Sequence, residues 1–248
     1  MHQLKSQFLN SDTDLRFFSI VTYAVDPIKL KKLIDENYDP YVIYIDKIQY
    51  GLVSAVTFLD TNFKFSCAPR LSGSNFWQTN YRAYVKNKFT DNNMVWFFRT
   101  TLGSNIVHFP KLLWKMPWYF GYYSTEISNN SFELNCESRG ANFALNLNYS
   151  NGEHEIRGFS SREEAIKILT DPQIGRYKRT DGKIGGYEIR HEKMKIRHGV
   201  ANNLYFELFD RLGLVNGDAF LSPHSILVTD SIHFEIQLPP TVISNLIR

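Results

Sequence analysis

Short runs of apolar residues, many of them alternating with polar ones and bounded by turn residues, recur along most of the chain. Runs rich in β-branched and aromatic residues are typical of strands, because those side chains pack well on a pleated surface. We therefore predict strands at 15–25, 41–48, 52–59, 76–89, 94–102, 118–127, 132–138, 142–149, 176–179, 187–191, 226–228 and 233–237. The clearest hairpin joins 76–89 to 94–102 through TDNN, and 41–48 is expected to turn into 52–59 near Gly51.

Helical spacing is confined to the connections, at 27–36, 111–115, 162–169 and 203–212. Asp26 followed by Pro27 is a typical helix start. In residues 160–164, a serine followed three residues later by a glutamate forms a capping box. Pro110 favours a kink or a late start for the helix at 111–115. Many antiparallel strands with a few short helices indicate an α+β protein, mainly antiparallel β, built on a large barrel-like sheet.

Composition fits one domain covering residues 1–248. The chain is 43% hydrophobic and 15% aromatic, enough to bury a core, and no linker or low-complexity tract divides it. The net charge of +3 comes from charges spread along the whole chain, which argues against nucleic-acid and membrane partners. No leader or membrane span stands out, so we expect a cytoplasmic protein; homo-oligomerisation is left open.

The sequence carries no self-contained catalytic or metal-binding motif. Cys67 and Cys136 stand far apart, and both are expected to be free thiols. His191 and His198 match no metal-ligand spacing. We expect no metal and no cofactor, and no catalytic residue can be named from motifs alone.

Three stretches carry a family resemblance. Residues 16–23 (RFFSIVTY) with the following Asp26 resemble the start of acetoacetate decarboxylases, in which an arginine opens a strand ending in Thr-Tyr. Residues 80–123 resemble the uncharacterised domain of unknown function family 2071, which shares that fold. LFDRLGLVNG (208–217) and PHSILVTDSIHFEIQLPP (223–240) are similar to the C-terminal part of the same proteins.

The resemblance implies an acetoacetate decarboxylase-like β-barrel with a site buried inside it. Decarboxylases place a Schiff-base lysine in a Pro-Lys-Lys sequence, where this chain has Pro117-Trp118-Tyr119. Neither an indole nor a phenol can form the iminium, so that mechanism is not expected here. The alignment puts Arg82 in place of the family's strand glutamate, and retains only Arg16.

Two hypotheses of different classes remain open. In the first, the barrel holds a small anionic or carbonyl ligand, bound by Arg16 and Arg82 and enclosed by Tyr84, Trp96 and Trp118, with Tyr119 beside them. Such a protein could be a binding protein, or a lyase, cyclase or hydratase without a Schiff-base lysine. In the second, aromatic side chains fill the barrel, and the protein has a structural or interaction role. A cavity touching Arg16 would favour the first hypothesis, and solid packing the second.

Overall fold

Strands dominate the computed structural model, which describes residues 11–65, 74–128, 131–150 and 155–243. Most predicted strands are confirmed, several with greater length than expected. The strands are β1 (Ser11–Val25), β2 (Tyr38–Pro40), β3 (Val42–Ile45), β4 (Ile48–Phe65), β5 (Ser74–Asn87), β6 (Asn93–Leu102), β7 (Trp118–Phe120), β8 (Tyr122–Ile127), β9 (Ser131–Glu137), β10 (Phe143–Ser150), β11 (Ile174–Lys178), β12 (Ile184–His191), β13 (Arg197–Phe206) and β14 (Ser225–Ile243). The loop expected at 67–74 and the turns at 129–130 and 151–152 lie almost wholly outside the described residues, as does Cys67.

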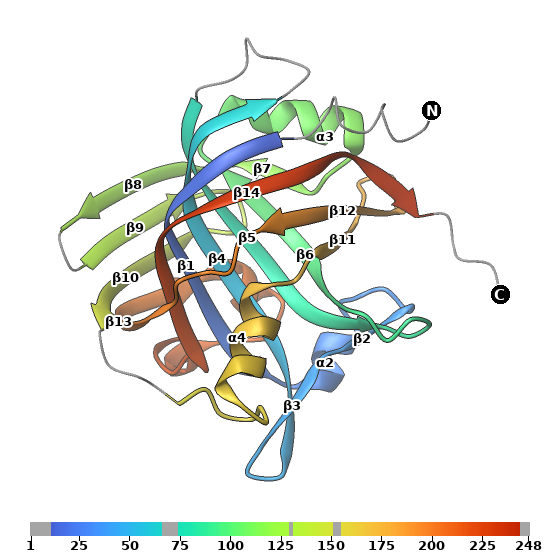
Figure 1. Cartoon of the computed structure of the whole chain (residues 1–248), viewed down its shortest axis with the longest axis vertical. Coiled ribbons are helices and arrows are strands. Elements are labelled where there is room, and N and C mark those ends of the chain that lie inside the picture. Colours follow the sequence, from blue (N-terminus) through green and yellow to red (C-terminus); the bar gives the residue numbers. More distant parts are fainter. Residues whose placement is uncertain (1–10, 66–73, 129–130, 151–154, 244–248) are drawn as a thin grey trace.

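The strands form one mostly antiparallel sheet in the order β1-β4-β5-β6-β11-β12-β14-β13-β10-β9-β8 (Figure 1). Parallel pairing occurs between β6 and its neighbours β7 and β11. β1 also pairs with β14 along most of its length, so the path from β1 to β14 returns to its start. We call β1, β4, β5, β6, β11, β12 and β14 the strand ring. The sheet continues beyond β14 through β13, β10, β9 and β8, which lie to one side of the strand ring.

Two turns differ from the sequence prediction. The β3–β4 hairpin reverses at Asp46 and Lys47, not near Gly51, because these two residues take the left-handed conformation that a tight hairpin turn requires. The aromatic stretch 118–127 is two strands broken at Gly121. A Cβ at Gly121 would lie 2.6 Å from Thr101 Cγ2 and 2.7 Å from Cys136 Sγ, so only glycine allows this close approach.

The helices are short and begin close to where their caps predict. α2 (Pro27–Lys31) follows Asp26, whose carboxylate accepts from the amide of Ile28 at 2.8 Å. α3 (His108–Trp114) starts earlier than expected, because Pro110 falls in its first turn, where a missing donor is tolerated. α4 (Arg162–Thr170) is capped by Ser161, and Glu164 accepts from the amide of Ser160. The helix predicted at 203–212 is instead the end of β13 followed by α5 (Glu207–Arg211).

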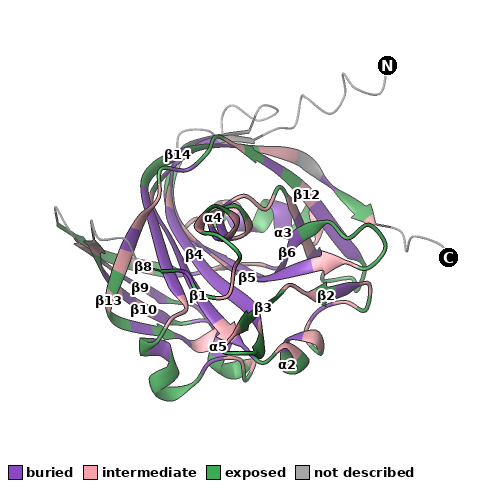
Figure 2. Cartoon of the chain, turned by 60° about the horizontal axis from the view of Figure 1, so that its bottom comes forward, coloured by how far each residue is buried: buried purple, intermediate pink, exposed green. Residues whose placement is uncertain are grey.

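Each face of the ring strands packs into a different core. On β6, for example, Trp96 belongs to one hydrophobic cluster, while its neighbours Val95 and Phe97 belong to the other. The outer cluster joins β1, β4 and β5 to β9, β10, β13 and α5. The inner cluster contains Ala165 and Leu169 of α4, which lies inside the strand ring in the view of Figure 2. α4 therefore plugs part of the space that the ring encloses.

Candidate functional site

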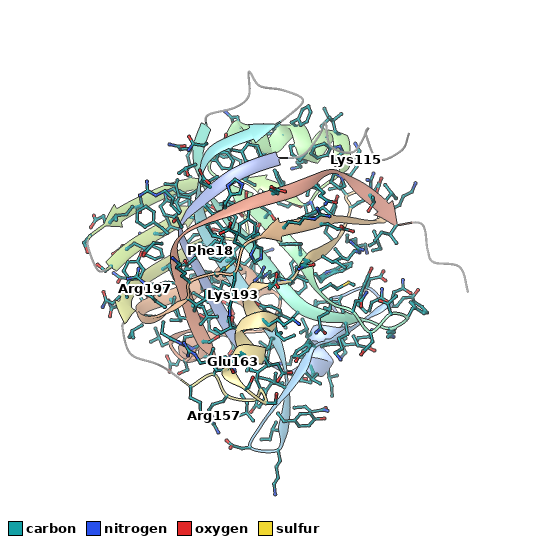
Figure 3. The ribbon with its side chains drawn as sticks, viewed as in Figure 1. Phe18, Lys115, Arg157, Glu163, Lys193 and Arg197 are labelled. Carbon is teal, nitrogen blue, oxygen red and sulfur yellow. The ribbon has the colours of Figure 1, made fainter. Side chains whose placement is uncertain are left out.

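A cavity of about 70 Å³ remains inside the strand ring beside α4. By the same measure one water needs about 10 to 15 Å³, so the cavity has room for a small molecule of several heavy atoms. Its wall is mostly apolar and aromatic and includes Phe18 of β1, which is labelled in Figure 3. The strands contribute alternate residues to the wall, as the period of two requires: Val56, Phe58 and Asp60 from β4, and Gln78, Asn80 and Arg82 from β5.

Arg82 supplies a buried positive charge to this cavity. The residue is only 7% exposed. Nη2 donates to the main-chain carbonyl of Leu169 at 3.0 Å and to the Tyr84 hydroxyl at 3.2 Å. Nε has no hydrogen-bond partner, and no carboxylate in the described part of the chain pairs with the guanidinium. A buried cation with a free donor is able to hold an anionic group of a ligand in the bidentate way that arginine favours.

Asp60 is the second polar feature of the wall, and the sequence analysis missed it. Its Oδ1 accepts from the Thr13 hydroxyl at 3.0 Å, while Oδ2 is buried without a partner among the described residues. Burial raises the pKa of this carboxyl group to about 7, and the hydrogen bond from Thr13 lowers it by less. The available signal was a lone acidic residue in the apolar run LVSAVTFLD.

The polar side chains between these two residues already have partners. Asn80 Oδ1 accepts from Gln78 Nε2 at 3.0 Å and from the Thr100 hydroxyl at 2.8 Å. Burial raises the pKa of the nearby Tyr187 hydroxyl, which therefore stays protonated. The arrangement offers a ligand one cation, one buried carboxyl group and apolar walls.

A surface groove between α4 and the β12–β13 connection adjoins the cavity. Thr170, His191 and Met194 line both spaces. Figure 3 marks Glu163 and Lys193, which line the groove from its two sides. The His191 ring stacks on Phe234 at 4.6 Å, and its Nε2 lies 3.6 Å from a carboxylate oxygen of Asp171. The groove and the cavity therefore share part of their lining.

Arg16 does not lie at the polar end of the cavity, so its predicted position is wrong. Its side chain is exposed, and its guanidinium carbon lies 5.6 Å from the Phe17 ring centre. β1 carries a bulge between Arg16 and Ser19, with Phe17 at φ 51°. The bulge lets Leu15 and Phe18 both face inward and leaves Arg16 outside.

The remaining predicted ligand residues divide between the cavity and other surroundings. Trp118 lines the cavity, close in sequence to Trp114 and Met116, which also line it. Tyr84 shares the inner face of β5 with Arg82 but does not line the cavity, and its hydroxyl accepts from Arg82 Nη2. Trp96 is on the opposite face of β6 and packs against Tyr38, with ring centres 5.6 Å apart. The structure therefore brings Arg82 and Trp118 to one cavity, and keeps Trp96 out of it.

Tyr119 lies outside the cavity, between two cations. Its ring centre is 4.1 Å from the guanidinium carbon of Arg99 and 4.6 Å from Lys111 Nζ. Arg99 itself is buried, and its nitrogens donate to the Thr101 and Ser138 hydroxyls and to the Arg139 carbonyl. Since these donors are used within the protein, Tyr119 and Arg99 form a structural contact rather than part of the cavity.

The fold is that of acetoacetate decarboxylase and its structural relatives. The acetoacetate decarboxylase from Legionella pneumophila subsp. pneumophila str. Philadelphia 1 superposes with a TM-score of 0.63 at 10% identity, covering 94% of this chain and 87% of that one. An acetoacetate decarboxylase-like enzyme from Sphingomonas wittichii RW1 gives 0.62 at 12% identity, covering 96% and 94%. The enduracididine biosynthesis enzyme MppR, in a complex with pyruvate, gives 0.62 at 13% identity, covering 96% and 91%.

At these identities the superpositions establish the fold alone. The sequence places the protein more narrowly: the profile of DUF2071, described as "Uncharacterized conserved protein (COG2071)", matches residues 13–232, and the chain belongs to that family. No curated protein matches the sequence. The resemblance seen in the sequence is thereby confirmed. Among the described residues no helix is long and apolar enough to cross a membrane.

Proposed function

We propose that the protein is a single-domain β-barrel whose interior cavity binds a small anionic molecule, with Arg82 holding the anionic group. The observation that carries the proposal is the buried guanidinium of Arg82, which has a free Nε and no carboxylate partner among the described residues. Keeping a charged group away from water is costly unless something compensates it. A bound carboxylate would supply that compensation.

The walls favour a ligand with an apolar portion. Phe18, Phe58, Phe97 and Phe234 line the cavity together with Trp118. Small-molecule sites commonly combine such walls with a few polar groups that fix the orientation of the ligand. The complex of MppR with pyruvate supports the same ligand class, since pyruvate is a small carboxylate that also carries a carbonyl group.

The proposal does not include Schiff-base chemistry. No lysine is among the described residues that line the cavity, and Trp118 lines it where the decarboxylases are expected to have their lysine. A neutral amine within reach of a ligand carbonyl is the requirement for an iminium. The site therefore suits binding, or a reaction that needs only hydrogen bonding and proton transfer.

A ligand screen tests the proposal. Thermal shift and calorimetry with acetate, pyruvate, acetoacetate and longer monocarboxylates should reveal saturable binding to the wild type. The Arg82→Gln variant should bind these carboxylates at least tenfold more weakly, as expected for the loss of a buried charge-assisted hydrogen bond. Arg16→Gln, at an exposed arginine that does not line the cavity, is the matched control and should bind as the wild type does.

Arg82 also joins β5 to α4, so its replacement can reduce stability. Arg82→Lys keeps the positive charge but loses the planar guanidinium that binds a carboxylate through two parallel hydrogen bonds. This variant should show weakened but measurable binding. If no carboxylate binds the wild type, or if Arg82→Gln binds as well as Arg16→Gln, the cavity is not an anion site. The alternative hypothesis, an aromatic-filled barrel with a structural role, would then be favoured.

A further inference from the structure

The last strand of the sheet, β8, has an open edge. The strand path ends at β8, which pairs with β9 and with no other strand in the described part of the chain. In Figure 1 it lies at the outer side of the molecule, away from the strand ring. Its register with β9 runs without a bulge from Tyr122 to Ile127, over about 20 Å. Proteins commonly block such an edge with proline, lysine or a bulge, and β8 contains none of these.

The backbone groups on this edge belong to alternate residues. The Ser128 amide donates to the Ser131 carbonyl at 2.9 Å, so the backbone groups of Ser128 face β9. These directions alternate along an antiparallel strand. The N–H and C=O groups of Tyr123, Thr125 and Ile127 therefore point away from β9, where water or another strand has to satisfy them.

The apolar packing of the sheet also ends at β8. Ile127 is 48% exposed, although it stands directly opposite Phe132, a member of the outer cluster. Tyr123 shares the face of Ile127 and packs against Phe143, with ring centres 5.9 Å apart. The outer cluster thus reaches the edge of the sheet and leaves an apolar side chain partly in water.

We propose that β8 pairs with β8 of a second copy of this chain, antiparallel about a two-fold axis at Thr125, so that one sheet runs through both copies. A two-fold axis normal to the sheet keeps the same face of both copies on the same side. Thr125 then lies opposite its counterpart, and Tyr123 lies opposite Ile127 of the second copy. Each of these pairs exchanges two backbone hydrogen bonds, so all the groups on the open edge are satisfied.

The opposed side chains favour this register over its neighbours. Paired threonines, and an aromatic residue facing a β-branched one, are favourable cross-strand neighbours. On the other face, Glu126 lies opposite Ser124 of the second copy, so like charges are not directly opposed. An axis at Ser124 would put Ile127 opposite Gly121, whose amide already donates to the Leu102 carbonyl. An axis at Glu126 would oppose two carboxylates.

The size of the contact predicts a reversible dimer. One strand pair buries less than the roughly 1,200 Å² at which stable interfaces begin, so association should depend on concentration. Sedimentation velocity from low micromolar to near-millimolar protein should show monomer converting to dimer. No larger species should form, because the pairing occupies the open edge of both copies. The interior cavity takes no part in this contact, so the inference does not depend on the proposed function.

A charge introduced at Ser124 tests the register. Ser124→Lys places a lysine opposite Glu126 of the second copy, twice in each dimer, and should tighten the dimer about threefold to tenfold at low salt. The gain should disappear at high salt. With an axis at Ser124, the same substitution would oppose two lysines and weaken the dimer. Asn203→Lys adds the same charge at an exposed position of β13, three strands from the edge, and should leave the dimer unchanged.

Two further substitutions test the edge itself. Thr125→Pro removes an N–H that points to the open edge, a position where a strand tolerates proline, and should weaken the dimer at least tenfold. Ile127→Lys should weaken it similarly, by placing a charge beside Tyr123 of the second copy. Circular dichroism should show both variants folded. A wild type that stays monomeric at all concentrations, a dimer that neither substitution weakens, or a dimer weakened by Ser124→Lys overturns the inference.

Discussion

The hydroxyl of Tyr84 donates to the main-chain carbonyl of Leu169 at 3.0 Å, and Arg82 Nη2 donates to the same oxygen at the same distance. Leu169 lies in the last turn of α4, where carbonyls have no partner within the helix. The two side chains of β5 therefore complete the helix end and fix α4 inside the strand ring. The same contacts hold Arg82 against the cavity wall.

Removing the Tyr84 hydroxyl should loosen α4. Tyr84→Phe loses the donor to Leu169 and leaves the Ser54 hydroxyl without this acceptor, which should cost about 1 to 3 kcal/mol. Urea unfolding measures the change, and amide exchange in α4 should accelerate. Tyr44→Phe, at an exposed tyrosine, should change stability by less than about 0.5 kcal/mol. Equal effects of the two substitutions would show that the bond to Leu169 contributes nothing.

Asp60 should make the protein less stable as pH rises towards neutrality. Its pKa is raised from 3.8 to about 7 in the folded state, so between about pH 4 and pH 7 the folded state holds a proton that the unfolded state has released. The contribution is fully present below pH 4 and is lost by pH 7. At 1.36 kcal/mol per pKa unit the loss amounts to about 4 kcal/mol.

Urea unfolding of the wild type and Asp60→Asn at pH 5, 6, 7 and 8 measures this contribution. The stability of Asp60→Asn relative to the wild type should increase with pH up to about pH 7 and then stay constant. Asp46→Asn, at an exposed aspartate on the β3–β4 turn, should show no such trend. A constant difference between Asp60→Asn and the wild type at all four pH values would contradict the raised pKa.

Cys136 should be chemically inert in the folded protein. Burial raises the pKa of its thiol to about 12, and the hydrogen bond with Tyr123 and the charge of Arg99 lower it by less. At pH 8 only about one molecule in 10⁴ carries the reactive thiolate. Iodoacetamide should leave the peptide containing Cys136 unmodified in buffer and modify it fully in 8 M urea, as measured by mass spectrometry. Rapid modification in buffer would show that the thiol is accessible.

Acetoacetate should not form a covalent adduct with the protein. A surface lysine with an ordinary pKa near 10.4 is almost wholly protonated at neutral pH and is a poor nucleophile. Incubation with acetoacetate and borohydride should leave the intact mass unchanged and release no carbon dioxide above background. A reduced adduct on Lys115 or another lysine, with turnover lost in its alanine variant, would return the chain to the decarboxylase mechanism.

Local patterns predicted much of the fold. The apolar and aromatic runs on either side of the TDNN turn located β5 and β6, and Ser161 with Glu164 located the start of α4. The helix predicted at 203–212 includes residues 203–206, which belong to β13. Leu204, Phe206 and Phe209 fit both the helical and the strand period, so the pattern alone did not separate the two elements. The strand predicted at 233–237 is part of a longer one, because β14 continues through Pro239 and Pro240 to Ile243. Its pairing with β12 has an irregularity near these prolines.

The candidate site was harder to predict, because it depends on which way each strand faces. Arg82 and Trp118 were identified from the sequence and line the cavity, whereas ligand binding by either stays a prediction. Both faces of β6 carry aromatic residues, so periodicity could not exclude Trp96. One extra residue in the β1 bulge turned Arg16 outward, and no sequence signal marks such a bulge. The raised pKa of Asp60 depends on its burial, which the sequence alone does not reveal.

The pairing of β1 with β14 also affects how the chain acquires its structure. Ser11 lies opposite Ile236, so the contacts that complete the strand ring join residues from nearly opposite ends of the described chain. Until β14 has been synthesised, one edge of β1 lacks its partner strand and the apolar interior is open to water. Proteins dominated by such distant pairings fold slowly, on a scale of about milliseconds to seconds. Stopped-flow refolding should place this protein at the slow end of that range, and a nascent chain ending before Ser225 would depend on chaperones to avoid aggregation.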